Sequence, residues 1–561
     1  MVISLNNCSL SSIVVFILYF TISNLWILPV ENARILAVET LGCKSHWNFM
    51  SAVLRSLTDA GHSVTVFTPL PDGDRDNYTE VDLSNDFPIL MAKDMKATLD
   101  VYGNPIVYMN MKTGLNRRYC DSVYGNRRFN EVIRGKYNED FDVIIIEPLS
   151  VDCMSYLASI LNLPIIYVIP SPMITYAERK FTGHISNPAV VSNLLAQRAV
   201  PKTFVQRVAN TALLAYSMLI TVYDEWMLRV TDPRPYDLSP KVHPSIIFQN
   251  SHYITESSRP VLPNLVDVGG IHLKPPKSIP KDVLDFIEDS PHGVIYFTFG
   301  SIIQLSSLPE NIIKSFKEAF ANVPQRVLWK YEGEMKDVPK NVMIKKWFPQ
   351  RDILLHPKIK LFISHGGISG VYEAVDGGVP VLGFPLFFDQ PRNIDNLVTA
   401  EMAISMDLFT INKEKLLNNI LQLVNNEKYM RNAKIASQLF KDRPMSPEQS
   451  VVYWTEYVIR HKGAPHLKSH GLNLTWYQYF LLDVIANNSY TPPGIFDIED
   501  LDGGTIIPGQ WRRDQNNLTP LARIGRKPSL AAQEIRDKFC DFFFKVLLLK
   551  YTLARQLLML K

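Results

Sequence analysis

The stretch FISHGGISGVYEA, residues 362–374, places a histidine and two glycines where a buried strand gives way to a helix. The apolar run ends at His365, Gly366 and Gly367 follow, and apolar residues at helical spacing begin after them. Glycines at such a junction allow positive φ angles, and the first amides of the helix have no intrahelical partners. Free amides and the helix dipole together favour a phosphate group. The segment therefore predicts an anion site; on this segment alone, a plain helix entrance remains the alternative.

Strands and helices alternate on both sides of this junction. Apolar runs typical of buried strands lie at 34–42, 62–70, 141–149, 293–301, 325–331, 359–367 and 379–387. Helical patterns lie between them, for example at 46–61 and 311–323. Such alternation indicates parallel sheets covered on both faces, with ligands bound at the carboxyl ends of the strands. The sequence becomes rich in proline near 258–280, which indicates a domain boundary. It therefore predicts two Rossmann-like α/β domains, 34–262 and 281–470, joined by a linker at 263–280.

Length and composition fit this organisation. The chain has 561 residues, of which 47% are hydrophobic and 20% charged, which is typical of more than one folded domain. A net charge of +3 does not favour a nucleic-acid partner. The five cysteines lack CxxC spacing, so the sequence indicates neither a zinc site nor a disulfide framework.

The two ends of the chain differ from its middle. An apolar run at 12–28 predicts a signal peptide over 1–33, with a retained N-terminal anchor as the alternative. Together with glycosylation sequons, this run predicts the lumen or membrane of the endoplasmic reticulum; the sequons start at Asn77, Asn473, Asn487 and Asn517. The C-terminal region, 471–561, is atypical, because its last apolar stretch is broken by charges. That stretch predicts association with a membrane surface rather than a clear transmembrane helix.

Polar side chains suited to a nucleotide sugar flank the glycines. Trp347 can stack on a base, Gln350 can read the polar edge of that base, and Glu373 can accept from ribose hydroxyls. Asp389 and Gln390, after the next strand, suit the hydroxyls of a sugar. Each of these residues alone is more often structural, but their order along the chain indicates a nucleotide-sugar site.

The gapless run WFPQRDILLHPKIKLFISHGGISGVYEAVDGGVPVLGFPLFFDQ, residues 347–390, resembles the signature of the UDP-glycosyltransferases. The resemblance extends from about residue 34 to 486, and the insect members are the most similar. It implies a GT-B fold, in which two Rossmann-like domains face a cleft. It also implies transfer of a hexosyl group from a UDP-sugar to a hydroxyl of a small lipophilic acceptor, with UDP-glucose favoured as the donor and UDP-glucuronate as the alternative. A UDP-sugar-binding protein with impaired or no turnover is the alternative.

The resemblance also implies which residues hold the donor. Trp347 would stack on uracil, Gln350 would contact the uridine, and Glu373 the ribose. The remaining donor contacts would be Ser301, His365, Gly366 and Gly367 to the diphosphate, and Asp389 and Gln390 to the sugar. Relatives often carry Asn where this chain has Ser369, and this difference is expected to weaken one diphosphate or sugar contact.

His46 is the candidate general base, because the pKa of an imidazole suits removal of a hydroxyl proton. In the family this histidine pairs with an acidic residue, usually Asp. Here Glu147 directly follows a buried strand and is favoured over Asp152, although Glu is longer by a methylene. The predicted reaction is a single displacement with inversion that needs no metal ion and no cofactor, since the UDP-sugar is a co-substrate.

Segments 170–195 and 211–223 are expected to form the walls of the acceptor pocket, although both could equally be core. A homo-oligomer remains possible.

Overall fold

The computed structural model describes residues 32–85, 87, 94–135, 141–148 and 153–488, and the described chain as far as Ile485 forms one compact unit. Residues 1–31 of the predicted signal peptide and residues 489–561 of the predicted C-terminal region lie outside these ranges, as does Asp152.

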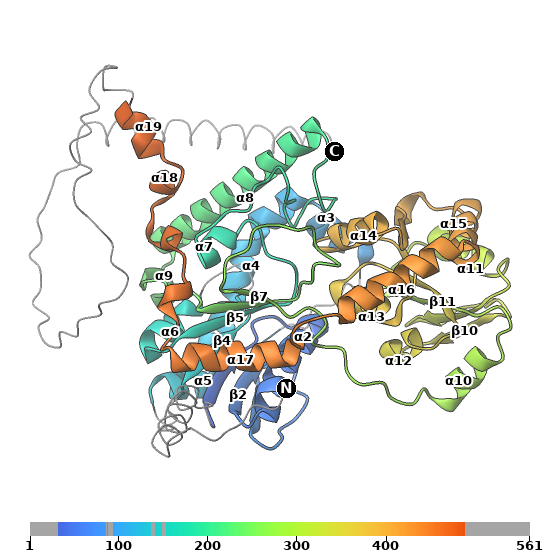
Figure 1. Cartoon of the computed structure of the whole chain (residues 1–561), viewed down its shortest axis with the longest axis horizontal. Helices are drawn as coiled ribbons and strands as arrows, with labels where there is room; N and C mark the ends of the chain where they lie inside the picture. The colour runs from blue at the N-terminus through green and yellow to red at the C-terminus, as the bar shows by residue number, and fades with distance from the viewer. Residues whose placement is uncertain (1–31, 86, 88–93, 136–140, 149–152, 489–561) are drawn as a thin grey trace, which may run out of the picture. The chain divides into compact units, whose positions relative to one another are not determined.

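A parallel sheet of seven strands forms the first half of this unit (Figure 1), with the order β3-β2-β1-β4-β5-β6-β7. Its strands are β1 (Arg34–Val38), β2 (Ser63–Thr68), β3 (Tyr78–Asp82), β4 (Val143–Ile146), β5 (Ile165–Ile169), β6 (Ile246–Gln249) and β7 (Leu265–Asp267). The order reverses between β1 and β4, which is where open parallel sheets bind their ligands.

Helices cover both faces of this sheet. The helices of the first half are α2 (Lys44–Asp59), α3 (Met95–Tyr102), α4 (Pro105–Gly125), α5 (Arg127–Ile133), α6 (Ser155–Leu161), α7 (Glu178–Thr182), α8 (Phe204–Thr231) and α9 (Pro235–Leu238). Every residue of β4 and of β5 is buried, which explains why these strands read as continuous apolar runs.

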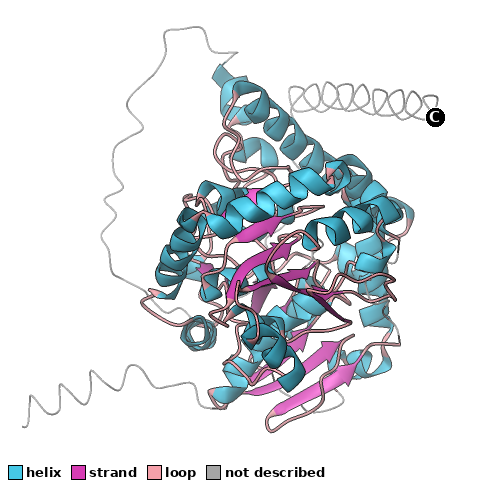
Figure 2. Ribbon diagram, turned by 90° about the vertical axis from the view of Figure 1, so that its right-hand side faces the viewer, coloured by secondary structure: helices cyan, strands magenta, loops and turns pink. Residues whose placement is uncertain are grey.

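A second parallel sheet, of six strands, has the order β10-β9-β8-β11-β12-β13. Its strands are β8 (Val294–Thr298), β9 (Arg326–Lys330), β10 (Val342–Lys345), β11 (Ile359–Ser364), β12 (Val381–Gly383) and β13 (Ala403–Ser405). The helices that follow the first sheet along the chain are α10 (Lys281–Glu288), α11 (Glu310–Phe320), α12 (Gln350–Leu354), α13 (Ile368–Gly377), α14 (Gln390–Thr399), α15 (Lys413–Asn425), α16 (Glu427–Lys441), α17 (Pro447–Arg460), α18 (Trp476–Tyr479) and α19 (Leu482–Asn488). Figure 2 shows the strands lying between layers of helices.

The two parallel sheets confirm the predicted fold class, two Rossmann-like α/β domains of the GT-B type.

The boundaries of the two domains differ from the predicted ranges at two places. β7 lies inside the range predicted as linker, 263–280, because its backbone extends the first sheet beside β6. α17 lies inside the range predicted as the second domain, 281–470, yet it packs on α2 and β6 of the first sheet (Figure 1). Its buried residues Val451 and Val458 belong to the core of the first half, so the last long helix ties the two halves together.

One disulfide joins Cys120 in α4 to Cys153 before α6. Cysteine spacing indicated no disulfide framework and did not identify this single bridge. The partners are 33 residues apart and come together only through the packing of α4 and α6 on the sheet, which cysteine spacing does not reveal.

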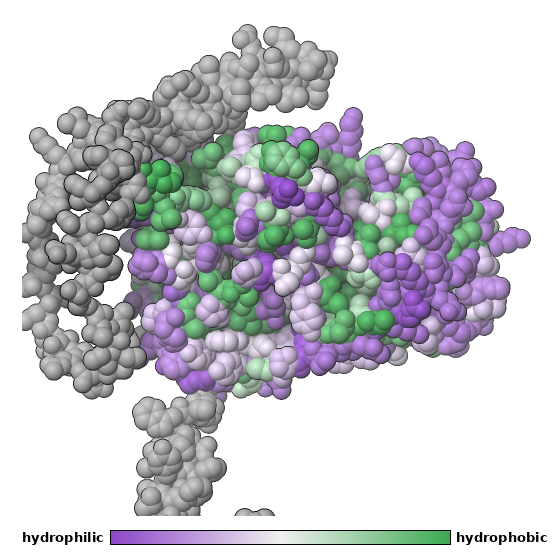
Figure 3. Space-filling view, turned by 45° about the horizontal axis from the view of Figure 1, so that its top comes forward, coloured by the Kyte–Doolittle hydropathy of each residue, from purple (hydrophilic) through white to green (hydrophobic). Residues whose placement is uncertain are grey.

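No helix in the described part of the chain is long and apolar enough to cross a membrane. The surface is nevertheless uneven. Apolar residues gather on the side where α8 lies, whereas the side of the second sheet is mostly hydrophilic (Figure 3). The exposed apolar residues of α8 are Phe204, Val205, Val208, Val222, Trp226 and Val230.

Candidate active site

His46 stands in the first turn of α2, beside the carboxyl end of β4. Its Nδ1 lies 2.6 Å from Oε1 of Glu147, the first residue after β4. Glu147 is buried, and burial raises the pKa of its carboxyl to about 7. The structure thus brings together an imidazole and a carboxyl group that lie 101 residues apart in the sequence.

A glycine turn follows β11 and leads into α13. Gly366 has a φ of +84°, and a Cβ there would lie 2.5 Å from Ile394 Cγ1. Gly367 is the N-cap residue with a φ of −61°, so the expectation of a positive φ is wrong for this residue. Its role is close packing, because a Cβ at Gly367 would lie 2.6 Å from Nε2 of His365. The amides at the start of α13 therefore stay uncovered beside the histidine ring.

The His365 ring sits between this turn and the loop after β8. A Cβ on Gly300 would lie 2.8 Å from the ring, and Ser301 follows it at the pocket wall. Burial, helped by the charge of Lys330, lowers the pKa of His365 to about 4. The imidazole is therefore neutral at neutral pH, and it approaches an anion as a hydrogen-bond donor rather than as a cation.

Gln350 and Glu373 form the next part of the site. The Gln350 side-chain amide donates to Oε2 of Glu373, and Gln350 Oε1 accepts from the Tyr296 hydroxyl at 3.3 Å. Burial raises the pKa of Glu373 to about 7. Trp347 lies between β10 and α12 with 67% of its surface exposed, so its ring is accessible to a base.

Asp389 and Gln390 begin α14. Asp389 accepts from Asn393 Nδ2 at 2.7 Å, and the same amide group donates to the carbonyl of Gly366 at 2.9 Å. Asn393 therefore links the predicted sugar holder to the glycine turn. Gln390 Oε1 accepts from the amide of Leu386 at 2.9 Å, which fixes the loop before the helix. Burial raises the pKa of Asp389, and the nearby His46 opposes that shift.

These groups surround one pocket of about 550 Å³, a size typical of ligand sites. Every predicted site residue except Gly366 lines it. The catalytic candidates come from the first sheet and the donor candidates from the second. Among the described residues, no group of three or more His, Cys, Asp or Glu side chains is placed to hold a metal ion.

Known proteins are similar to this chain in sequence. Residues 34–488 match the family described as UDP-glucoronosyl and UDP-glucosyl transferase. UDP-glucosyltransferase 2 of Dactylopius coccus is 37% identical over 470 residues, covering 81% of this chain and 90% of the relative. UDP-glucuronosyltransferase 2B17 of Rattus norvegicus is 33% identical over 476 residues, covering 79% and 87%. A solved structure, the glycosyltransferase SnogD of Streptomyces nogalater, is 15% identical with a TM-score of 0.47 and covers 76% and 99%.

The chain belongs to the UDP-glycosyltransferase family. The match spans most of the chain, so the predicted resemblance is confirmed. Membership of this family supports transfer of a sugar from a UDP-sugar to an acceptor.

Several pocket residues of this transferase were missed in the sequence. His272 donates from Nε2 to the carbonyl of Ser369 at 3.1 Å, and burial lowers its pKa to about 4. Lys330 closes β9 and donates to the Gly300 carbonyl at 3.0 Å. The sequence did carry a signal for each of them. Lys330 is a charged residue at the end of a buried strand, and His272 follows shortly after a pair of glycines.

The acceptor side of the pocket also differs from expectation. Residues of the segment 170–195 line it, as predicted, but residues 211–223 of α8 do not. Its second wall is formed by α3 and α4, with Tyr102 and Tyr108 on it. Both rings lie against Phe388, at centroid distances of 5.4 and 5.1 Å.

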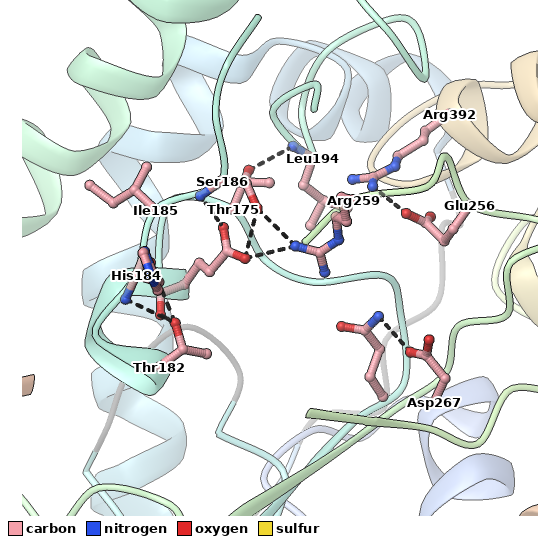
Figure 4. Close-up of polar contacts among 12 residues, drawn as sticks. Thr175, Thr182, His184, Ile185, Ser186, Leu194, Glu256, Arg259, Asp267 and Arg392 are labelled. Carbon is pink, nitrogen blue, oxygen red and sulfur yellow. Dashed lines mark hydrogen bonds and ion pairs between the residues drawn. The ribbon is translucent and has the colours of Figure 1, made fainter. Parts of the chain in front are cut away.

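A set of buried polar contacts holds α14 against the first half of the chain. Arg392, 2% exposed, pairs with Glu256 from the segment after β6 (Figure 4). One turn later, Asn396 donates to the carbonyl of Thr255 at 2.6 Å. In the same figure Arg259 reaches the Ser186 hydroxyl, at 2.8 Å. α14 thus has fixed contacts with both the glycine turn and the acceptor half.

Gly367→Ala should weaken UDP binding about 10- to 100-fold, because the new methyl group displaces His365 and misaligns hydrogen bonds to a charged ligand. Titration calorimetry with UDP measures this. Gly370→Ala, in the same helix and also at the pocket, is the matched control, since its Cβ would meet Gln350 Nε2 at an ordinary 3.4 Å. Equal losses in both variants would contradict the close-packing role.

Glu256→Leu should lower the free energy of unfolding by roughly 3–5 kcal/mol, because it leaves the buried Arg392 guanidinium without its carboxylate. The double variant Arg392→Met, Glu256→Leu removes both charges and should recover most of that loss. Denaturant unfolding measures both. A double variant less stable than the single one would show that the two side chains are not coupled.

Proposed function

We propose that the chain transfers glucose from UDP-glucose to a hydroxyl of a small lipophilic acceptor, with inversion and with His46 as general base. One observation carries the proposal. The His46–Glu147 pair and the glycine turn after β11 come from different sheets and line the same pocket. This reaction needs a general base for the acceptor hydroxyl and hydrogen-bond donors that stabilise the leaving diphosphate.

The pair supplies the base. Ionised Glu147 accepts from Nδ1 of His46, so the ring proton sits on Nδ1 and the Nε2 lone pair is left for the acceptor. Nε2 removes the hydroxyl proton while the acceptor oxygen bonds to C1 of the glucosyl group. The bond from C1 to the β-phosphate oxygen breaks, and its electron pair leaves with UDP. Attack and departure on opposite faces of C1 invert its configuration.

The glycine turn stabilises the departing UDP. The amide of Gly367, the neutral His365 ring and the Ser301 hydroxyl line the pocket and are the proposed donors to its developing charge. The Gly366 amide, also predicted as a donor, instead donates to Ser364 Oγ at 3.1 Å. These donors are fixed before the reaction, so little reorganisation is required. We propose that they hold the diphosphate without a metal ion.

The charges around the pocket support a neutral sugar. Three Lys or Arg side chains are among its described lining residues, and each already pairs with a carboxylate. These pairs are Lys44–Asp72, Lys330–Glu332 and Arg351–Asp376. A glucuronate carboxylate would have to compete for one of these cations, whereas the C6 hydroxyl of glucose needs none. The name of the Dactylopius relative, a glucosyltransferase, supports the same donor.

The aromatic wall made by Tyr102, Tyr108 and Phe388 supports a lipophilic acceptor, because such surfaces bind apolar groups. The Cys120–Cys153 disulfide supports folding in an oxidising compartment, consistent with the lumen of the endoplasmic reticulum. The exposed apolar side chains of α8 support association with a membrane surface.

In a transfer assay with UDP-glucose and a phenol, His46→Ala should lower kcat at least about 100-fold, because general-base catalysis contributes that much. Its UDP affinity should stay unchanged. UDP-glucuronate should give a kcat/KM roughly tenfold or more below that of UDP-glucose, a difference of about 1.4 kcal/mol.

The matched control is His356→Ala, which removes another histidine–carboxylate pair, His356–Glu288, outside the pocket. Equal UDP release by wild type and His46→Ala would overturn the mechanism. UDP binding without transfer in the wild type would favour the binding protein without turnover.

A further inference from the structure

Glu39 is a buried carboxyl group for which the reaction above has no use. It follows β1 directly, is 0% exposed, and its Oε1 accepts from the Leu41 amide at 3.2 Å. A buried acidic side chain without a cation beside it is costly, so its place in the fold calls for a reason.

Strand register puts Glu39 beside Glu147. The last residue pair of the parallel strands β1 and β4 is Val38 with Ile146, and the two glutamates are the next residues on their strands. The backbone continues the pairing, since the Glu147 amide donates to the Val38 carbonyl at 3.3 Å. Thr40 Oγ1 then donates to the Glu147 carbonyl at 2.8 Å. Residues at the same register on neighbouring parallel strands point to the same side of the sheet, so the two carboxyl groups lie beside each other.

Each carboxyl group has one oxygen that needs a partner. Oε2 of Glu39 and Oε2 of Glu147 are both buried without a hydrogen bond from any described donor. Two ionised carboxylates cannot meet this need, because neither has a proton to donate. One shared proton satisfies both, with one group as the acid and the other as the acceptor.

The acid of the pair is Glu39. Burial, reinforced by Glu147, raises the pKa of Glu39 well above its usual value, whereas the bond from Glu39 favours the ionised form of Glu147. Glu147 also has the imidazole of His46 at 2.6 Å, which favours its carboxylate form. Asp389, the N-cap residue of α14, is another carboxyl group near His46.

We propose that Glu39 is a positioning residue of this transferase: its protonated carboxyl donates to Glu147 and holds that group as the ionised acceptor of the His46 N–H. This role rests on the proposed function of His46 and Glu147. During transfer the proton of Glu39 stays in place, while the acceptor proton goes to His46 Nε2. Without the donor, Glu147 keeps its own proton to a higher pH and cannot accept from His46.

The test compares Glu39→Gln with Glu39→Leu in the full chain. The amide of Gln can still donate to Glu147, whereas Leu fills similar space without a donor. Glu39→Leu should lower kcat with UDP-glucose and a phenol about 10- to 100-fold, the usual effect of losing a hydrogen bond to a charged group. The acidic limb of its kcat/KM profile should move to higher pH. Glu39→Gln should stay within about threefold of wild type with its acidic limb unmoved.

UDP binding by calorimetry, unchanged in both variants, shows that the fold and the donor half are intact. A Glu39→Leu profile that matches wild type would overturn the proposal, and so would a loss in Glu39→Gln as large as in Glu39→Leu. His46→Ala, measured in the same assay, separates a failure of the Glu39 role from a failure of the proposed function. If it is inactive while Glu39→Leu is fully active, only the role of Glu39 fails. If it is active, the proposed function fails and the role of Glu39 fails with it.

Discussion

The site depends on the close contact of the His365 ring with two glycines, Gly300 and Gly367. Because these residues have no Cβ, the ring lies against the start of α13 on one side and against the loop after β8 on the other. The ring in turn stays neutral, because burial and Lys330 lower its pKa. A cationic histidine in this place would be desolvated beside a lysine, whereas a neutral one costs little and still offers an N–H to phosphate. The close packing of the His365 ring therefore explains both the geometry of the glycine turn and the neutral hydrogen-bond donor at the proposed diphosphate site.

Two points of reversed strand order meet at one pocket. β1 and β4 are neighbours at the reversal in the first sheet and lead to the proposed base and its carboxyl partner, while β8 and β11 are neighbours at the reversal in the second sheet and lead to the proposed diphosphate site. Asn393 and Arg392, both near the start of α14, connect these halves through Gly366 and Glu256. Buried hydrogen bonds and one ion pair therefore connect the glycine turn, through α14, to the first half of the chain.

The sequence predicted the parts of the structure that depend on local pattern. Buried apolar runs located the strands that carry His46, Glu147 and His365, since short apolar runs between amphipathic helices are typical of buried parallel strands. The partners formed by three-dimensional packing were missed. Glu39 meets Glu147 only through strand register, Cys120 meets Cys153 only through helix packing, and α17 returns to the first sheet across the whole second domain. Gly367 was identified for the wrong reason, because close approach to a ring does not show in local sequence.

A direct displacement by a hydroxyl that His46 has activated is the central claim, and the configuration of the product tests it most directly. Proton NMR of the glycoside formed from UDP-α-D-glucose and a simple phenol reports the anomer through the coupling between H1 and H2. The single-displacement geometry predicts the β-glucoside, with the large coupling of two axial protons. An α-glucoside would contradict this mechanism, because retention requires either a covalent intermediate or attack from the face that UDP occupies.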